Sequence, residues 1–176
     1  MKLSKYRRTG FDRGRSKFIE GLWIIFQALF VSSFLPGSYH RKVILQLFGA
    51  KIGDGVVLKP RIRIKFPWKL TIGGDSWIGE GVWIDNLARV DIADNVCISQ
   101  GAYLCTGSHN WKNEDFSLIV KPIFIKSSAW ICSNSMIAPG VIIGKNSVLT
   151  SFSFATSNLD SDSIYQGNPA SFKRKR

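Results

Sequence analysis

The chain carries an aliphatic residue at every sixth position over most of its length beyond residue 50. A first series consists of Ile52, Leu58, Ile64, Ile72, Ile78, Ile84, Ile92, Ile98, Leu104, Ile125, Ile131, Ile137, Ile143, Leu149 and Ala155. A second series, two residues earlier, holds small or β-branched side chains: Val56, Ile62, Ser76, Val82, Val96, Ala102, Ala129, Ser135, Val141, Ser147 and Ser153. Residues two apart share one face of a strand, and a step of six fits neither a helix nor a hairpin sheet.

Each hexapeptide therefore predicts one short strand followed by a corner. Residues that tolerate corner conformations lie between the strands, among them Gly53, Gly55, Gly73, Gly79, Gly81, Gly144, Asp54, Asp75, Asp94 and Asn95. Three edges make a coil of roughly eighteen residues, and stacked coils bury the aliphatic columns inside a parallel β-helix. The steps from Ile64 to Ile72 and from Ile84 to Ile92 are longer, which predicts small bulges at one corner. The fold class is all-β.

The regular pattern stops between Leu104 and Ile125, a stretch too long for the regular edges of one coil. We expect residues 105–122 to leave the coil as one external loop. Loops on a rigid scaffold frequently carry function, and His109 lies near the root of this one. Cys105 is close in sequence, so the residues alone leave a Cys–His nucleophile pair open.

Residues 1–50 are predicted to form a separate basic and apolar helical segment, with a last short helix ending near Gly49. The apolar run from Leu22 to Leu35 is shorter than the ~20 residues of a membrane-spanning helix. Three polar residues interrupt it: Gln27, Ser32 and Ser33. Residues 18–35 are expected either to lie on a membrane face or to pack against the domain. In the first case the anchoring side chains would be Trp23, Phe26 and Phe30.

Twenty-four Lys and Arg residues against twelve Asp and Glu residues give a formal net charge of +12, which predicts an anionic partner. Basic residues crowd the beginning of the chain and the C-terminal tail, residues 161–176, which ends in "KRKR". Neither a basic stripe interleaved with aromatics nor zinc-finger spacing is present, so no nucleic-acid partner is expected. The three cysteines lack CxxC spacing, which favours reduced thiols and a cytoplasmic location.

Several segments together resemble the hexapeptide-repeat acyltransferases, and more narrowly the colanic acid biosynthesis acetyltransferases and related exopolysaccharide O-acetyltransferases. These segments are "LFGAKIG", "PWKLTIG", "ISQGAYLCTGSHNW", "LIVKPI", "IAPGVIIG" and "IYQGNPA". The resemblance implies a left-handed parallel β-helix over residues 51–160 that assembles as a homotrimer. It also implies transfer of an acetyl group from acetyl-CoA to a sugar hydroxyl, without a metal. The acceptor is then a free or a lipid-linked glycan, and the second case suits peripheral membrane contact through residues 18–35.

The segment "LCTGSHNW" matches the active-site segment of this family. The resemblance implies that His109 is a general base acting on the acceptor hydroxyl. The segment "IDNLA" lies one coil below, where related enzymes carry an active-site asparagine. Asn86 is the candidate for positioning the acceptor or polarising the carbonyl, and Asp85 competes with it because the alignment is open by one residue. A purely structural role at the corner is the alternative for Asn86.

The same resemblance places the acetyl-CoA cosubstrate along the C-terminal coils, in a cleft between subunits. Ser133, Ser151 and Thr156 match positions that contact the pantetheine arm. Lys173 and Arg174 follow the segment "GNPA" and are expected to bind the nucleotide phosphates. In related enzymes the corresponding stretch is a run of small residues with a Lys-Asp pair and prolines. This chain has "SFSFATSNLDSDS" there instead, so the contacts of the last coil stay open.

The same fold also serves two other functions. A metal-dependent carbonic anhydrase needs three histidines around its metal, but the other histidine of the chain, His40, precedes the repeat. A homologue that has lost activity and serves as a β-helix scaffold remains the alternative to the enzyme.

Overall fold

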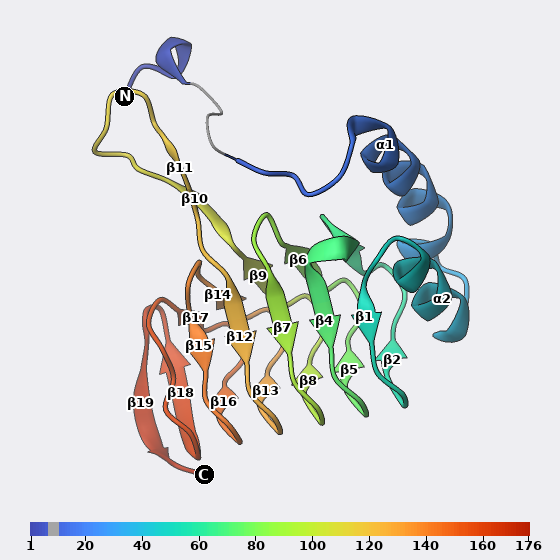
Figure 1. The fold of residues 1–176 in the computed structure, drawn as a ribbon. Helices are drawn as coiled ribbons and strands as arrows, with labels where there is room; N and C mark the ends of the chain where they lie inside the picture. Colours follow the sequence, from blue (N-terminus) through green and yellow to red (C-terminus); the bar gives the residue numbers. More distant parts are fainter. Residues whose placement is uncertain (7–10) are drawn as a thin grey trace.

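The computed structural model describes residues 1–6 and 11–176 and shows a stack of short strands with helices at one end (Figure 1). Arg7 and Arg8 of the basic N-terminal stretch lie outside the described residues. Strands of successive coils pair in parallel and form three sheets. The first contains β1 (Lys51–Ile52), β4 (Leu70–Ile72), β7 (Val90–Ile92), β12 (Ile123–Ile125) and β15 (Ile142–Ile143).

The second sheet contains β2 (Val57–Leu58), β5 (Trp77–Ile78), β8 (Cys97–Ile98), β13 (Trp130–Ile131), β16 (Val148–Leu149), β18 (Ser163–Gly167) and β19 (Ala170–Lys175). The third contains β3 (Arg63–Ile64), β6 (Trp83–Asp85), β9 (Tyr103–Cys105), β14 (Met136–Ile137) and β17 (Phe154–Ala155). The chain visits the three sheets in turn, as the period of six predicts. The all-β class and the parallel β-helix are therefore confirmed.

Both sequence series line the interior of the solenoid. In the first sheet, Ile72 lies in register with Ile92, which pairs with Ile125 of the next coil. All members of both series are buried. The buried serines of the second series have hydrogen bonds to backbone carbonyls; Ser76 donates to Ala93 and Ser147 to Gly144. Since a buried hydroxyl costs free energy unless it is paired, these contacts explain why serine is tolerated there.

The departures from the repeat all lie at one corner, where the chain passes from the third sheet to the first; we call it the irregular corner. In the first coil it contains the short helix η3 (Pro67–Lys69), and in the second the turn at residues 86–89. In the third coil the chain leaves as a hairpin of β10 (Gly107–His109) and β11 (Leu118–Val120). The predicted bulges and the external excursion are confirmed, and they form one column.

Asn86 holds two coils together at the irregular corner. Its side chain is fully buried. Oδ1 accepts a hydrogen bond from the Phe66 amide at 2.9 Å, and Nδ2 donates to the Phe66 carbonyl at 2.7 Å. The asparagine side chain thus takes the place of a backbone partner for the Phe66 amide, while the Phe66 carbonyl also accepts from the Lys69 amide at 3.0 Å.

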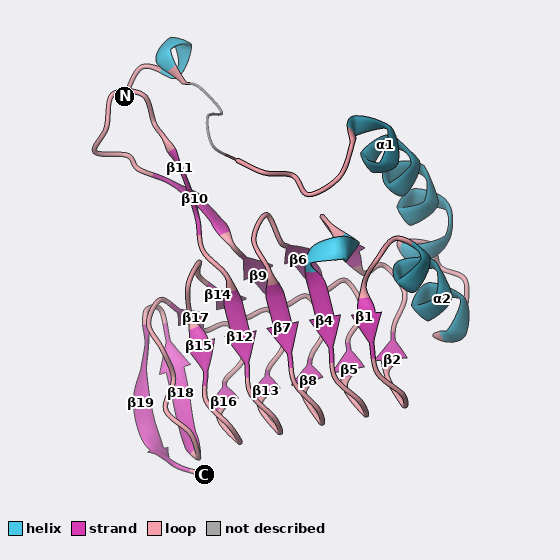
Figure 2. Cartoon of the chain, viewed as in Figure 1, coloured by secondary structure: helices cyan, strands magenta, loops and turns pink. Residues whose placement is uncertain are grey.

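The N-terminal segment covers the first coil with α1 (Lys17–Phe26), the π-helical turn η2 (Gln27–Val31) and α2 (Tyr39–Leu47), shown in cyan at one end of the solenoid in Figure 2. The first coil has no preceding coil to pair with, and its strand edges are bound by side chains instead. Gln27 accepts from the Ile64 amide at 2.6 Å, and Trp23 donates to the Ile64 carbonyl at 2.9 Å. Ser32 donates to the Ile62 carbonyl at 2.8 Å. Gln27 and Ser32, two of the three polar residues that interrupt the apolar run, therefore close the sheet edge.

At the other end, the C-terminal residues form two further strands rather than a loose extension. β18 pairs in parallel with β16, and β19 folds back antiparallel on β18. The last coil is shortened, because Leu159 already lies beside Ile143. Lys175 donates to the Ser163 hydroxyl at 3.1 Å. This hairpin covers the exposed edge of the last full coil.

Gly79 tests how closely the coils stack. A Cβ atom at this position would lie 2.6 Å from the Gln100 amide nitrogen and 2.7 Å from the Ser99 carbonyl carbon. Gly79→Ala is expected to destabilise the fold by about 1–3 kcal/mol, the usual cost of overpacking, and urea unfolding followed by circular dichroism measures it. Gly21→Ala is the control, because a Cβ there meets nothing within 4 Å. Equal unfolding midpoints for the two variants would contradict the stacking geometry.

Asn86→Ala tests the clamp at the irregular corner. The change leaves the buried Phe66 amide unpaired and removes one of two hydrogen bonds to the Phe66 carbonyl, which also accepts from the Lys69 amide. The expected cost is about 1–3 kcal/mol. Asn113→Ala removes an exposed asparagine of the hairpin and should change stability by less than about 0.5 kcal/mol. If Asn86→Ala unfolds at the same urea concentration as this control but loses activity, Asn86 acts in the reaction rather than in the fold.

Candidate active site

The hairpin of β10 and β11 raises His109 above the irregular corner. Gly107 pairs with Val120 and His109 with Leu118, in antiparallel register. Where the hairpin leaves the coil, Thr106 donates through its hydroxyl to the Asp85 carbonyl and accepts from the Ala88 amide, both at 3.0 Å. The root of the excursion is therefore bonded to the coil below, which holds His109 in place over that coil.

The surroundings of His109 determine which ring nitrogen can act as a base. Nδ1 lies 2.7 Å from the Phe116 carbonyl oxygen. A carbonyl oxygen can only accept, so Nδ1 carries the hydrogen and the lone pair of the neutral ring is on Nε2. The ring also stacks on that of Phe116, with centroids 4.2 Å apart and planes 2° apart. The imidazole is thus held in one tautomer and one orientation, as a general base requires.

A pocket of about 170 Å³ lies beside His109 and is lined partly by cationic side chains. Arg13 and Lys65 are among its lining residues, together with the apolar Phe11 and Leu118. The Arg13 guanidinium is paired with Glu20 at 2.7 Å, whereas Lys65 is exposed. The pocket therefore presents positive charge next to the candidate base.

The N-terminal residues reach across this pocket and hold the hairpin. The Lys2 amide donates to the Glu114 carbonyl at 2.7 Å, and the Lys2 and Lys5 ammonium groups pair with the Glu114 carboxylate at 3.2 and 2.5 Å. Lys5 and Lys2 lower the pKa of Glu114. The ring of Tyr6 packs edge-on against His109, with centroids 5.5 Å apart. No pattern in the sequence indicates this contact, because it joins residues more than a hundred positions apart.

The two candidate residues below the hairpin occupy different environments. Both ends of the Asn86 amide are bound to Phe66, so the structural role at the corner, left open by the sequence, is the one this geometry supports. Asp85 points outward from β6, and its Oδ2 accepts from the Tyr103 hydroxyl at 3.1 Å. Its Oδ1 is buried, with no hydrogen-bond partner among the described residues. Asp85 is therefore the member of the pair with an unused polar atom near the corner.

Tyr103 and Cys105 surround this carboxylate. Burial, followed by the Cys105 thiol and the Asp85 carboxylate, raises the pKa of Tyr103, so the phenol stays protonated and donates to Asp85. The Cys105 thiol donates to the Gly107 carbonyl at 3.0 Å. The thiol is therefore directed to a backbone carbonyl and not to His109, so the structure does not favour a Cys–His nucleophile.

Of the residues expected to contact the pantetheine arm, the structure brings two together. Ser133 and Ser151 lie at equivalent positions of successive coils, between the second and third sheets, and their hydroxyls are 3.1 Å apart. Thr156 follows β17, at the next corner around the coil. Within one chain Thr156 is thus not part of the Ser133 and Ser151 column.

The basic C-terminal residues divide into two kinds. Lys175 and Arg176 are bound to the chain itself, through the Ser163 hydroxyl and the Ser128 carbonyl. Lys173 and Arg174 are exposed. The pairing of β18 with β19 is irregular here, since Ile164 pairs with Arg174 and Tyr165 with Phe172. All four side chains are exposed, and of the four only Lys173 and Arg174 have no side-chain hydrogen bond to the described residues.

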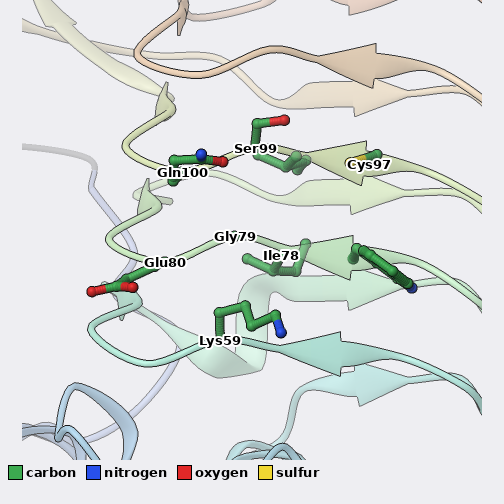
Figure 3. A pocket seen from close by; sticks show the side chains of 9 residues that line it. Lys59, Ile78, Gly79, Glu80, Cys97, Ser99 and Gln100 are labelled. Atoms are coloured by element: carbon green, nitrogen blue, oxygen red, sulfur yellow. The ribbon is translucent and has the colours of Figure 1, made fainter.

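A separate pocket of about 400 Å³ lies on the outer side of the second sheet. Figure 3 shows that its labelled residues come from three successive coils, with Lys59 on the first, Glu80 on the second and Ser99 and Gln100 on the third. The Trp130 indole donates to the Ser99 hydroxyl at 2.9 Å. This pocket adjoins the same corner column as Ser133 and Ser151, one corner away from His109.

Residues 1–6 and 11–176 contain no group of three or more His, Cys, Asp or Glu side chains placed to hold a metal ion. Within the same residues, no helix has both the length and the apolar character needed to cross a bilayer.

Comparison with known proteins identifies the family. No protein-family model matches the chain. A protein of Escherichia coli K12, WcaF, provisionally named a colanic acid biosynthesis acetyltransferase, is 36% identical over 167 residues, which cover 95% of this chain and 92% of WcaF. The galactoside O-acetyltransferase of the same organism is 26% identical over 132 residues, covering 73% of this chain and 65% of that protein.

Solved structures share the fold. The hexapeptide-repeat acetyltransferase VCA0836 of Vibrio cholerae superposes with a TM-score of 0.83 at 23% identity, covering 90% of this chain and 91% of that one. A second structure of VCA0836 contains acetyl-CoA. With the stacked coils, the excursion that carries His109 and the WcaF match over nearly the full length, the chain belongs to the hexapeptide-repeat acetyltransferase family, and it is an acetyltransferase of the WcaF group.

Proposed function

We propose that this acetyltransferase moves an acetyl group from acetyl-CoA to a hydroxyl of a sugar in a surface or extracellular glycan. The observation that carries the proposal is the fixed tautomer of His109, which leaves the Nε2 lone pair available beside a pocket at the irregular corner. The sugar acceptor is supported by the names of WcaF and of the galactoside O-acetyltransferase.

In the proposed reaction, Nε2 of His109 accepts the proton of the acceptor hydroxyl as its oxygen attacks the thioester carbonyl. A C–O bond forms, and the tetrahedral intermediate then collapses with loss of the C–S bond. The imidazolium returns the proton to the departing CoA thiolate. The Phe116 carbonyl stabilises the imidazolium while it exists, because it accepts from Nδ1 in both protonation states. The step needs no covalent acetyl-enzyme.

Acetyl-CoA binding is proposed for the C-terminal coils, with Ser133 and Ser151 at the pantetheine arm and Lys173 and Arg174 at the phosphates. In one chain this column and His109 lie at different corners of the solenoid. Two copies placed side by side would join one copy's His109 corner to the other's serine column, which supports the proposed homotrimer. The outward aromatic residues Trp77 and Trp130, 57% and 44% exposed, suit such contacts between subunits.

The first experiment compares wild type with His109→Ala and His109→Gln by the release of CoA thiol from acetyl-CoA. Nucleotide sugars, free glycans and lipid-linked glycans serve as acceptors. Loss of a positioned general base is expected to lower kcat by about 10²–10⁴. Transfer that persists at the wild-type rate in both variants would refute the role of His109.

The scaffold alternative is separated by a binding measurement. If no acceptor supports His109-dependent thiol release and calorimetry finds no binding of acetyl-CoA to the wild-type protein, the chain is a β-helix without activity. Binding of acetyl-CoA without turnover would instead indicate that the correct acceptor was missing from the panel.

The phosphate contacts are tested by the double change Lys173→Ala and Arg174→Ala. Loss of two charge-assisted contacts is expected to raise KM for acetyl-CoA by about tenfold or more, with little change in kcat. Lys126→Ala removes an exposed lysine from the first sheet and should leave KM unchanged. An equal KM for the double variant and this control would remove Lys173 and Arg174 from the site.

A further inference from the structure

We propose that the outward side of residues 18–37 docks on a lipid bilayer that contains anionic phospholipid. This apolar face is defined by the exposed residues of that stretch: Phe18, Gly21, Ile24, Ile25, Phe26, Ala28, Leu29, Phe30, Phe34, Leu35, Pro36 and Gly37. It lies on the helical segment at one end of the solenoid (Figure 1).

No exposed residue of the apolar face carries a polar side chain. Phe18 and Phe34 are each 73% exposed, and Leu29 is 59% exposed. An ordinary surface helix shows the opposite arrangement, with its charged residues outward. Exposed apolar areas of this kind mark a surface that is covered when the protein works.

The polar residues of the same stretch are turned away from the face. Gln27 and Ser32 bind the edge of β3 and the residue before it, and Ser33 donates to the Phe30 carbonyl. Glu20 pairs with Arg13, and its side chain is only 12% exposed. The polar residues therefore leave the outer side of the stretch to apolar side chains, while Trp23 and Val31 pack inward.

The turn at the far end of the face is held rigidly. Arg41 of α2 is fully buried, and its guanidinium donates to the carbonyls of Val31, Ser33, Leu35 and Gly37. These carbonyls belong to the last residue of η2 and to the turn after it. One buried cation therefore fixes the turn that carries Phe34 and Leu35. The exposure of these side chains belongs to the folded structure and is not a frayed end.

The charges around the face select a lipid surface over a second copy of the chain. Arg15 and Lys17 are exposed directly before it, and the Arg61 guanidinium lies 4.2 Å from the centroid of the Phe34 ring. Two copies packed face to face would bring these cations together on a chain of net charge +12, which is unfavourable. Aromatic and aliphatic side chains beside basic ones are typical of helices that lie in the interface of an anionic membrane.

The apolar face also leads towards the active site. Ile24 lines a pocket of about 290 Å³ together with Arg13 and Lys65, and these two cations line the His109 pocket as well. This step rests on the proposed function: an acceptor held in the bilayer by an apolar group would extend its sugar to His109 past Arg13 and Lys65. Their charge suits a phosphate in the linkage.

The docking test uses the full chain and sedimentation with vesicles of phosphatidylcholine alone or mixed with phosphatidylglycerol. We expect binding to the mixed vesicles, weaker binding to the neutral ones, and about a tenfold or greater loss of binding in the double variant Phe18→Ser and Phe34→Ser. Both side chains are largely exposed, so the variant should fold. Phe152→Ser is the matched control, since Phe152 is 75% exposed at the opposite end of the solenoid.

The outcomes separate the possible partners of the face. Equal vesicle binding by the double variant and the Phe152 control would overturn the proposal. Equal binding of the wild-type protein to vesicles with and without phosphatidylglycerol would overturn it as well. A smaller particle mass for the double variant in light scattering would assign the face to contacts between copies instead. Thiol release with a water-soluble acceptor does not need the bilayer, so its failure concerns the proposed function and leaves the vesicle result standing.

Discussion

The backbone of each coil pairs only with the coils on either side of it, and the rest of the structure depends on how this ladder is closed at its two ends. A parallel solenoid without ends covered would expose rows of unpaired amides and carbonyls, which are costly to bury and prone to pairing with other chains. Here the C-terminal edge of the second sheet is covered by strands β18 and β19. The N-terminal edge is covered by side chains, notably Trp23 and Gln27 on Ile64.

This solution has a consequence for the surface. The side of this segment that carries Trp23, Gln27 and Ser32 binds the sheet edge, so apolar residues of the other side, such as Phe18 and Leu29, are exposed. Stability of the first coil and exposure of these two residues therefore arise from the same arrangement. The proposed lipid contact would cover that surface. The end cap and the membrane contact are then two sides of one element, and the buried Arg41 stabilises both by fixing the turn after the helix.

The active site follows from the second structural constraint, the stacking of coils at their corners. Regular corners are tight, as the close approach of Gly79 to Gln100 shows, and leave no room for extra residues. All insertions therefore collect in one column, where the bulge of each coil supports the next. Asn86 binds the Phe66 amide and carbonyl, Thr106 bonds the hairpin root to Asp85, and His109 lies above both. The candidate site is thus built where the repeat is broken, on a scaffold that the repeat makes rigid.

The sequence by itself determined the solenoid, its inward columns, the corner that bulges and the point where the chain leaves the coil. These features follow from the period of six, because each hexapeptide places its own aliphatic residue on the buried face. It also made His109 the candidate base, through its position at the break and through family resemblance. The tertiary structure decided what depends on partners distant in sequence. Trp23, expected as a possible membrane anchor, packs instead on Ile64, with 2% of its surface exposed. Asn86 is engaged by Phe66 and leaves Asp85 with the unused oxygen, and the N-terminal lysines reach Glu114. A side chain that can hydrogen-bond in several ways takes the partner that folding brings to it, and no spacing along the chain specifies that choice.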